Sequence, residues 1–117
     1  MRLHHVQVSC PVGGEDAARR FYADALGIPE VAKPRALAAR GGCWFRGDSV
    51  EVHVGVEASF VPAQKAHPAL LVDDIEAVAE QIVGFGFPVT WDEEFPGYRR
   101  FYTVDGNGNR VEVLASL

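Results

Sequence analysis

Two kinds of hydrophobic periodicity alternate along the first half of the chain. Apolar residues at every second position, typical of a strand with one buried face, run through residues 6–10. Helical spacing of apolar residues follows over 17–26, and Gly27 is the expected C-terminal stop. Short strands are then predicted near residues 36–39, 43–46 and 50–54. The first half therefore predicts the order strand, helix, strand, strand, strand.

The second half of the chain shows the same order of patterns. Alternation returns over residues 67–72, and a helical stripe follows from Ile75 to Val83. Asp73 and Glu76 have the spacing of a capping box at the start of that helix. Further strands are predicted near residues 88–91, 99–104 and 110–114.

The two halves also share residues, which indicates an internal duplication. Residues 47–52 read GDSVEV and residues 108–113 read GNRVEV, an offset of 108 − 47 = 61. His5 and His67 are offset by 67 − 5 = 62. We therefore expect a single domain over residues 1–117, with one module at about 1–58 and a second at about 65–117.

Strand parity gathers the chemically active side chains on one face of the sheet in each module. We expect helices to cover the opposite, apolar face. Each module then offers an imidazole on its first strand and a carboxylate on its last, a donor set that suits a divalent first-row metal ion. A solvated polar face is the alternative interpretation. The residues on this face are His5, Glu51, His53, His67 and Glu112.

Composition excludes several classes of partner. The formal net charge is −5, from 11 basic and 16 acidic residues, which argues against binding to nucleic acid or anionic membranes. No apolar run approaches the roughly 20 residues of a membrane span, and the start does not resemble a signal peptide. We expect a cytoplasmic protein in which Cys10 and Cys43 are buried, reduced thiols.

Four sets of residues carry a family resemblance, namely 5–8, 20–22 with 26–27, His67 with 72–74, and 108–112. Together they resemble the vicinal oxygen chelate superfamily. This group includes glyoxalase I, bleomycin-resistance proteins, fosfomycin-resistance transferases and extradiol dioxygenases. The resemblance covers essentially the whole chain and implies an α+β fold. Two tandem βαβββ modules would form a curled mixed β-sheet cleft with helices on the outer face.

Carried over to this sequence, the resemblance implies that His5, His67 and Glu112 bind a divalent metal ion. Iron, manganese, nickel and zinc are not distinguished. A fourth ligand is expected only in a glyoxalase-like protein, and Glu51 and His53 are both candidates. The internal repeat equates Glu51 with Glu112, whereas His53 is the more unusual residue on that strand. In a glyoxalase-like reaction Glu112 or Glu51 would also shuttle a proton, whereas three ligands would suit an iron dioxygenase.

We therefore expect a metal-dependent enzyme acting on a small oxygen-chelating substrate, either a glyoxalase-like lyase or isomerase or a dioxygenase-like enzyme. The alternative is a non-catalytic, bleomycin-resistance-like binding protein. Trp44, Arg100 and Tyr102 are candidate substrate contacts, and the loop at 95–98 is expected at the cleft mouth. We also expect a homodimer, because open sheet edges tend to be covered by a partner.

Overall fold

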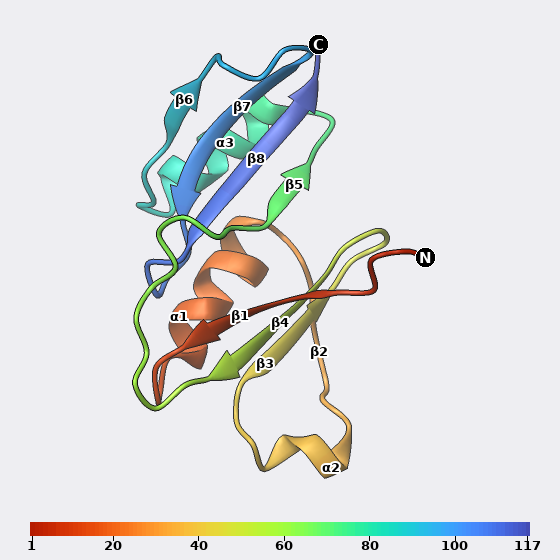
Figure 1. Cartoon of the computed structure of the whole chain (residues 1–117), viewed down its shortest axis with the longest axis vertical. Helices are drawn as coiled ribbons and strands as arrows, with labels where there is room; N and C mark the ends of the chain where they lie inside the picture. The colour runs from red at the N-terminus through yellow and green to blue at the C-terminus, as the bar shows by residue number, and fades with distance from the viewer.

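The computed structural model describes all 117 residues and contains two four-stranded sheets (Figure 1). The first module consists of β1 (Val6–Cys10), α1 (Glu15–Arg19), the π-helix η1 (Arg20–Ala25), β2 (Glu30–Val31), α2 (Arg35–Ala38), β3 (Cys43–Arg46) and β4 (Glu51–Val56). The second consists of β5 (Ala69–Leu71), α3 (Ile75–Gly84), β6 (Thr90–Asp92), β7 (Tyr98–Val104) and β8 (Arg110–Ser116).

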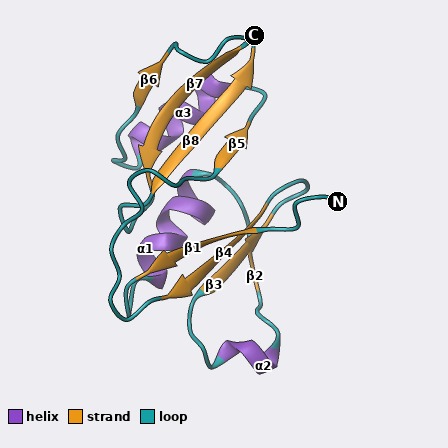
Figure 2. Ribbon diagram, in the orientation of Figure 1, coloured by secondary structure: helices purple, strands orange, loops and turns teal.

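Both sheets have the same topology. The strand orders are β1-β4-β3-β2 and β5-β8-β7-β6. In each sheet the first strand pairs in parallel with the last strand, and the other neighbours pair antiparallel. Figure 2 shows α3 behind the second sheet, where it covers one face of the long strands β7 and β8. The α+β fold of two tandem modules is thus confirmed.

The parity prediction for the core is confirmed. Alternate residues Val52, Val111 and Val113 are fully buried beneath the helices, together with Phe21 and Ile82. One continuous hydrophobic core contains residues of both modules. Further positions expected on this face pack against that core, namely Val6, Val8, Leu26, Leu70, Val72 and Val78.

Two local predictions were wrong. Residues 36–39 were expected as a strand, but most of them lie in helix α2, and the first module's extra strand is β2 at Glu30–Val31. The Ala- and Leu-rich composition there favours a helix over a strand. Helix α3 is capped by Asp74 rather than Asp73, because the Asp74 carboxylate accepts a hydrogen bond from the Ala77 backbone N–H at 3.1 Å.

A buried polar network links the two modules and fixes how their sheets sit together. The hydroxyl of Tyr22 donates to Oδ2 of Asp105 at 2.8 Å, and the side-chain amide of Asn109 donates to the carbonyl of Ser9 at 2.7 Å. The β7–β8 turn approaches α1 so closely that a Cβ at Gly106 would lie 2.0 Å from the Ala17 carbonyl oxygen. The turn that precedes β8 is therefore anchored on the first module.

Two further sequence expectations concern the cysteines and the membrane. Cys10 and Cys43 are buried and unpaired, as expected. Burial raises the pKa of Cys43 to about 11, which leaves its thiol protonated and unreactive at neutral pH. None of the helices has the length and apolar composition of a membrane span.

Candidate metal centre

In the second module, His67 and Glu112 face each other on the polar side of the sheet. Glu112 lies on the central strand β8 and is only 4% exposed. The Nε2 atom of His67 is 3.4 Å from Oε2 of Glu112. The Nδ1 atom of His67 is 2.8 Å from the carbonyl oxygen of Lys65. Because a carbonyl oxygen only accepts, a neutral His67 ring carries its proton on Nδ1 and turns the Nε2 lone pair toward the carboxylate.

This pair of acceptor atoms fits a divalent cation. Two ligand atoms bound at about 2.1 Å in tetrahedral geometry lie about 3.4 Å apart, which is the separation of the His67 and Glu112 atoms. A hydrogen bond from the second ring nitrogen to a backbone carbonyl is also typical of metal-binding histidines. The donor set therefore fits the metal ion that the sequence predicts.

Arg100, from the neighbouring strand β7, holds the other oxygen of Glu112. Its Nη1 atom donates to Oε1 of Glu112 at 2.7 Å, and its Nε donates to Asp92 at 3.1 Å. The guanidinium lies 5.1 Å from the ring centroids of both Phe95 and Tyr102. Tyr102 pairs with Glu112 in the sheet register. Arg100 and Tyr102 therefore lie beside the candidate ligand Glu112, on the face where the sequence placed them.

In the first module, the ring of His53 lies between two other rings. His5 stacks on it with a centroid distance of 3.9 Å, and Trp44 stacks on it at 3.8 Å. Trp44 lies on β3, and His5 directly precedes β1. These two strands flank β4 on opposite sides, so both faces of the imidazole are covered. Only the edge of the His53 ring remains available for polar contacts.

That edge contacts Glu51. Nε2 of His53 lies 2.7 Å from Oε2 of Glu51, and Nε of Arg46 donates to Oε1 at 2.7 Å. The hydrogen bonds from Arg46 and then from His53 lower the pKa of Glu51 to about 2. The pKa of His53 is itself lowered, chiefly by burial, although Glu51 opposes that shift. Glu51 is therefore a permanent negative charge at neutral pH.

Alternation places His4 on the opposite side from His5, at the surface; His4 is indeed exposed, but its ring joins this cluster. The Nδ1 atoms of His4 and His5 are 2.9 Å apart, and donor atoms of His4, His5 and Glu51 all lie within 4.8 Å of one another. Strict alternation fails here because both histidines precede β1, which begins at Val6. The signal in the sequence for this part of the cluster was the pair of consecutive histidines, His4 and His5.

The alternative ligands Glu51 and His53 are two residues apart on β4, and two observations bear on the choice between them. The register pairs Gln7 with His53 and Ala69 with Glu112, so the sheets equate His53 with Glu112 once His5 is matched with His67. The repeated sequence motif instead equates Glu51 with Glu112. In the structure Glu51 groups with His5, whereas His53 orients Glu51 through a hydrogen bond.

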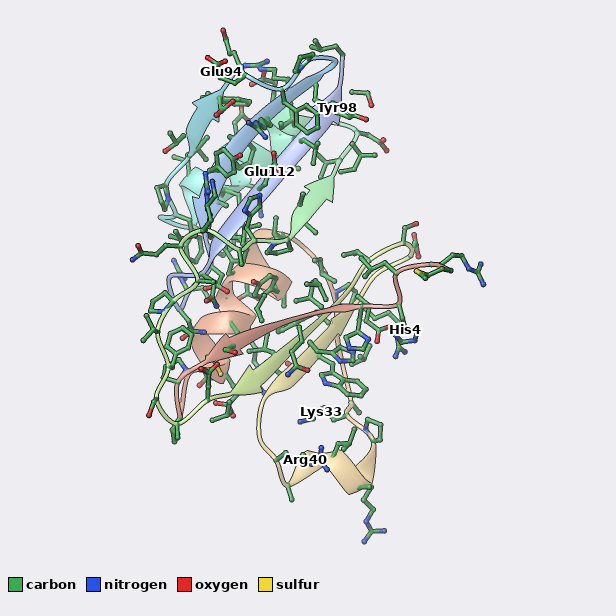
Figure 3. The ribbon with its side chains drawn as sticks, in the orientation of Figure 1. His4, Lys33, Arg40, Glu94, Tyr98 and Glu112 are labelled. Atoms are coloured by element: carbon green, nitrogen blue, oxygen red, sulfur yellow. The ribbon has the colours of Figure 1, made fainter.

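The two clusters lie on different sheets of the chain, and Figure 3 shows His4 beside the first sheet and Glu112 on the second. Within one chain, His67 and Glu112 do not join the group formed by His4, His5 and Glu51. A cavity of about 360 Å³ lies between the modules. Its polar lining includes Gln7, Ser9, Glu57, His67, Asn109 and Arg110.

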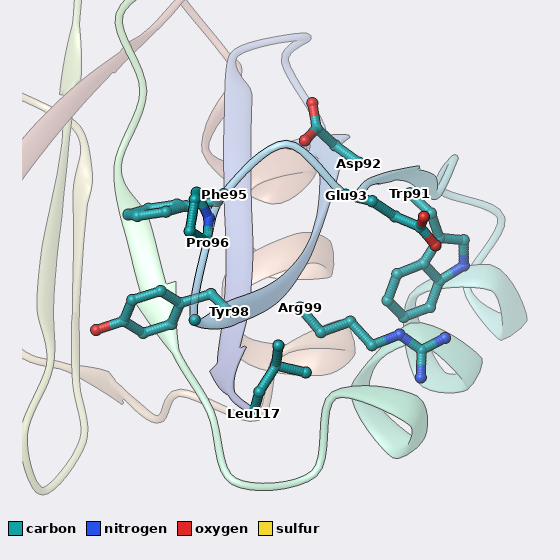
Figure 4. A pocket seen from close by; sticks show the side chains of 9 residues that line it. Trp91, Asp92, Glu93, Phe95, Pro96, Tyr98, Arg99 and Leu117 are labelled. Carbon is teal, nitrogen blue, oxygen red and sulfur yellow. The ribbon is translucent and has the colours of Figure 1, made fainter.

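The loop expected at the cleft mouth borders a separate cavity of about 290 Å³, shown in Figure 4. Phe95 and Tyr98 line it, with their rings 4.8 Å apart, and so do Trp91 and Leu117. No candidate metal ligand borders this cavity. Its connection to the candidate metal centre is through Phe95, which also contacts Arg100.

Comparison with known proteins gives the family. No protein-family profile matches the chain, and no curated protein matches it. Among solved structures, a glyoxalase family protein from Bacillus anthracis is 42% identical over 100% of this chain and 96% of its own length, with a TM-score of 0.95.

More distant structures share the fold. A variant of the fosfomycin resistance protein FosX from Listeria monocytogenes, solved with Mn(II) and 1S,2S-dihydroxypropylphosphonic acid, is 15% identical over 99% of this chain and 92% of its own, with a TM-score of 0.79. An antibiotic-binding protein from a Streptomyces species is 21% identical over 100% and 99%, with a TM-score of 0.71. On the strength of its close relative from Bacillus anthracis and its paired modules, the chain belongs to the glyoxalase family of the vicinal oxygen chelate superfamily.

Proposed function

We propose that this protein is a divalent-metal-dependent enzyme that acts on a small substrate bearing two neighbouring oxygen atoms. The observation that carries the proposal is the His67–Glu112 pair. Nε2 of His67 lies 3.4 Å from Oε2 of a buried carboxylate, and with Nδ1 donating to a backbone carbonyl a neutral ring would leave Nε2 as an acceptor. Two acceptors in that arrangement favour a cation between them. The Mn(II) in the FosX structure supports a divalent ion in a protein of this fold.

The proposed ligands are His5, His67 and Glu112, with Glu51 as the fourth and His53 as the residue that orients Glu51. A divalent ion in this shell would polarise a substrate oxygen and stabilise negative charge that develops there. Glu112 or Glu51 would move the proton, since a carboxylate that faces the substrate is the available general base. Trp44, Arg100 and Tyr102 would line the substrate site.

We propose a homodimer in which the first module of one chain completes the second module of its partner. A folded monomer of 12.7 kDa is expected to expose about 6,200 Å². This chain exposes 7,260 Å² and extends over 43 × 29 × 25 Å. Leu71, on an edge strand of the second sheet, is 67% exposed. A second copy would cover such surface and bring the two ligand clusters together.

A second candidate function is ligand binding without chemistry. The stack of Trp44, His53 and His5 supports it, because flat aromatic rings are common in sites that bind planar or cationic molecules. The antibiotic-binding protein of the same fold is consistent with it. Such a protein would have no requirement for a metal.

The experiment that separates the two functions is a metal analysis. The tag-free protein, purified without chelators, is assayed for bound metals, and the chelator-treated protein is titrated by calorimetry with manganese, iron, nickel and zinc. The proposed enzyme binds at least one of these ions. A protein that neither retains nor binds any of them would instead be a binding protein.

A further inference from the structure

Arg110 differs from the other arginines beside the candidate ligands. It begins β8 and lies on the same face as Glu112, two residues further along the strand. Arg46 and Arg100 are both paired with carboxylates. The guanidinium of Arg110 has no ion pair and no hydrogen bond. The backbone N–H of Arg110 donates to the carbonyl of Ala63 at 2.8 Å.

The unpaired guanidinium is nevertheless held in place. Its Cζ atom lies 3.9 Å from the ring centroid of Tyr102, and the side chain is half-buried. The same Tyr102 ring meets His67 edge to face, with a centroid distance of 5.5 Å. A guanidinium stacked on a ring keeps its N–H groups at the edge available for a planar, bidentate contact. The Arg110 side chain is thus oriented and lacks an acceptor.

The cavity between the modules offers the space for that acceptor. Arg110 and His67 line it together with the side chains of Gln7 and Ser9, which can both donate hydrogen bonds. Glu57 is the one carboxylate in its lining, and it is exposed and not paired with Arg110. Because the chain as a whole carries a net charge of −5, a cationic group here is a local feature and not part of a basic surface.

We propose that this cavity binds the anionic group of the substrate, a carboxylate, phosphonate or phosphate, through a bidentate contact with Arg110. Tyr102 positions the guanidinium, and the cavity directs the rest of the substrate toward His67 and Glu112. This inference rests on the proposed function in one respect: it takes the bound anion to be part of the enzyme's substrate. The anion contact itself requires no metal.

The test uses the full-length protein, treated with chelator and kept metal-free. It is titrated by calorimetry with inorganic phosphate, methylphosphonate, acetate and, as a neutral control, acetamide. Comparing phosphate and methylphosphonate with acetate shows whether the site prefers phosphate and phosphonate groups or carboxylates. Arg110→Gln is expected to weaken binding of the preferred anion by about tenfold to a hundredfold, since hydrogen bonds to charged groups have that strength. Arg110→Lys should recover part of the loss, because lysine restores the positive charge but cannot make the planar, bidentate contact of a guanidinium.

Arg40→Gln, which removes an exposed arginine outside this cavity, is the matched control and should bind as the parent does. Equal affinity in the parent and Arg110→Gln, or a parent that binds none of the three anions, would overturn the inference. Metal titrations of the same variants separate the two proposals. Anion binding that depends on Arg110 in a protein that binds no metal would support this inference and contradict the metalloenzyme.

Discussion

The indole of Trp44 lies nearly parallel to the imidazole of His53, with 5° between the ring planes and 3.8 Å between the centroids. His5 covers the opposite face of the same imidazole. This stack shields His53 from water, and burial is the main reason that the pKa of His53 is lowered. The hydrogen bond from His53 then fixes the Glu51 carboxylate, so the stack determines where a candidate ligand points.

Replacing Trp44 with leucine should therefore raise the pKa of His53 toward its ordinary value. The smaller side chain admits water to one face of the imidazole and reduces the desolvation of its charged form. Titration of the histidine ring protons by NMR measures the shift. Trp91→Leu is the matched control, because Trp91 packs on Phe101 in the other module and should leave the His53 pKa unchanged.

Acid should destabilise the fold partly through Glu51. Its pKa is about 2 in the folded protein, below the ordinary value of 4.5, so the folded state favours the charged form. The resulting stabilisation is fully present above pH 4.5 and is lost as the pH falls toward 2. Glu51→Gln should show a smaller loss of unfolding free energy over that interval in urea denaturation. Glu80→Gln, on the exposed side of α3, should behave as the parent does.

The contact between the modules should contribute measurably to stability. Tyr22→Phe removes the hydroxyl that donates to the buried Asp105 carboxylate, and this should lower the free energy of unfolding by about 1–3 kcal/mol. Tyr98→Phe makes the same chemical change at a hydroxyl without a hydrogen-bond partner in the structure and should cost little. Equal effects of the two substitutions would show that the Tyr22–Asp105 contact does not hold the modules together.

Periodicity was sufficient to predict the two modules and the faces that join the core, because apolar and polar residues alternate at the start of strands such as β4 and β8. It failed at residues 36–39, where composition favours a helix, and at His4, which precedes the paired part of β1. The arginine contacts to Glu51 and Glu112 come from neighbouring strands, so they depend on register, which one strand's sequence does not determine. The separation of the two ligand clusters depends on how the two sheets pack against each other, which periodicity along the chain does not predict.

Metal affinity should depend on His67 and Glu112. Loss of an outer residue that orients a metal ligand typically weakens affinity about 10- to 100-fold, so His67→Ala and Glu112→Gln should each cost at least that much. Affinity should also fall in acid, because a histidine nitrogen must be free of its proton to bind a metal ion. Calorimetric titration of both variants, with Glu80→Gln as the control, measures the effect. Parent-like affinity in both would exclude this pair as ligands.

The proposed dimer makes a prediction that only a site shared between chains satisfies. A His5→Ala chain and a His67→Ala chain should each bind metal weakly by themselves. If one site combines His5 of one chain with His67 of another, a mixed dimer has one site with both defects and one intact site. Random exchange of equal amounts places half of the chains in mixed dimers, so about a quarter of all sites should regain parental affinity.

Light scattering should give twice the mass of 12.7 kDa for the parent. A mixture that regains no tight site while both variants remain dimeric would place His5 and His67 of the same chain in one site, and a monomeric parent would contradict the dimer itself.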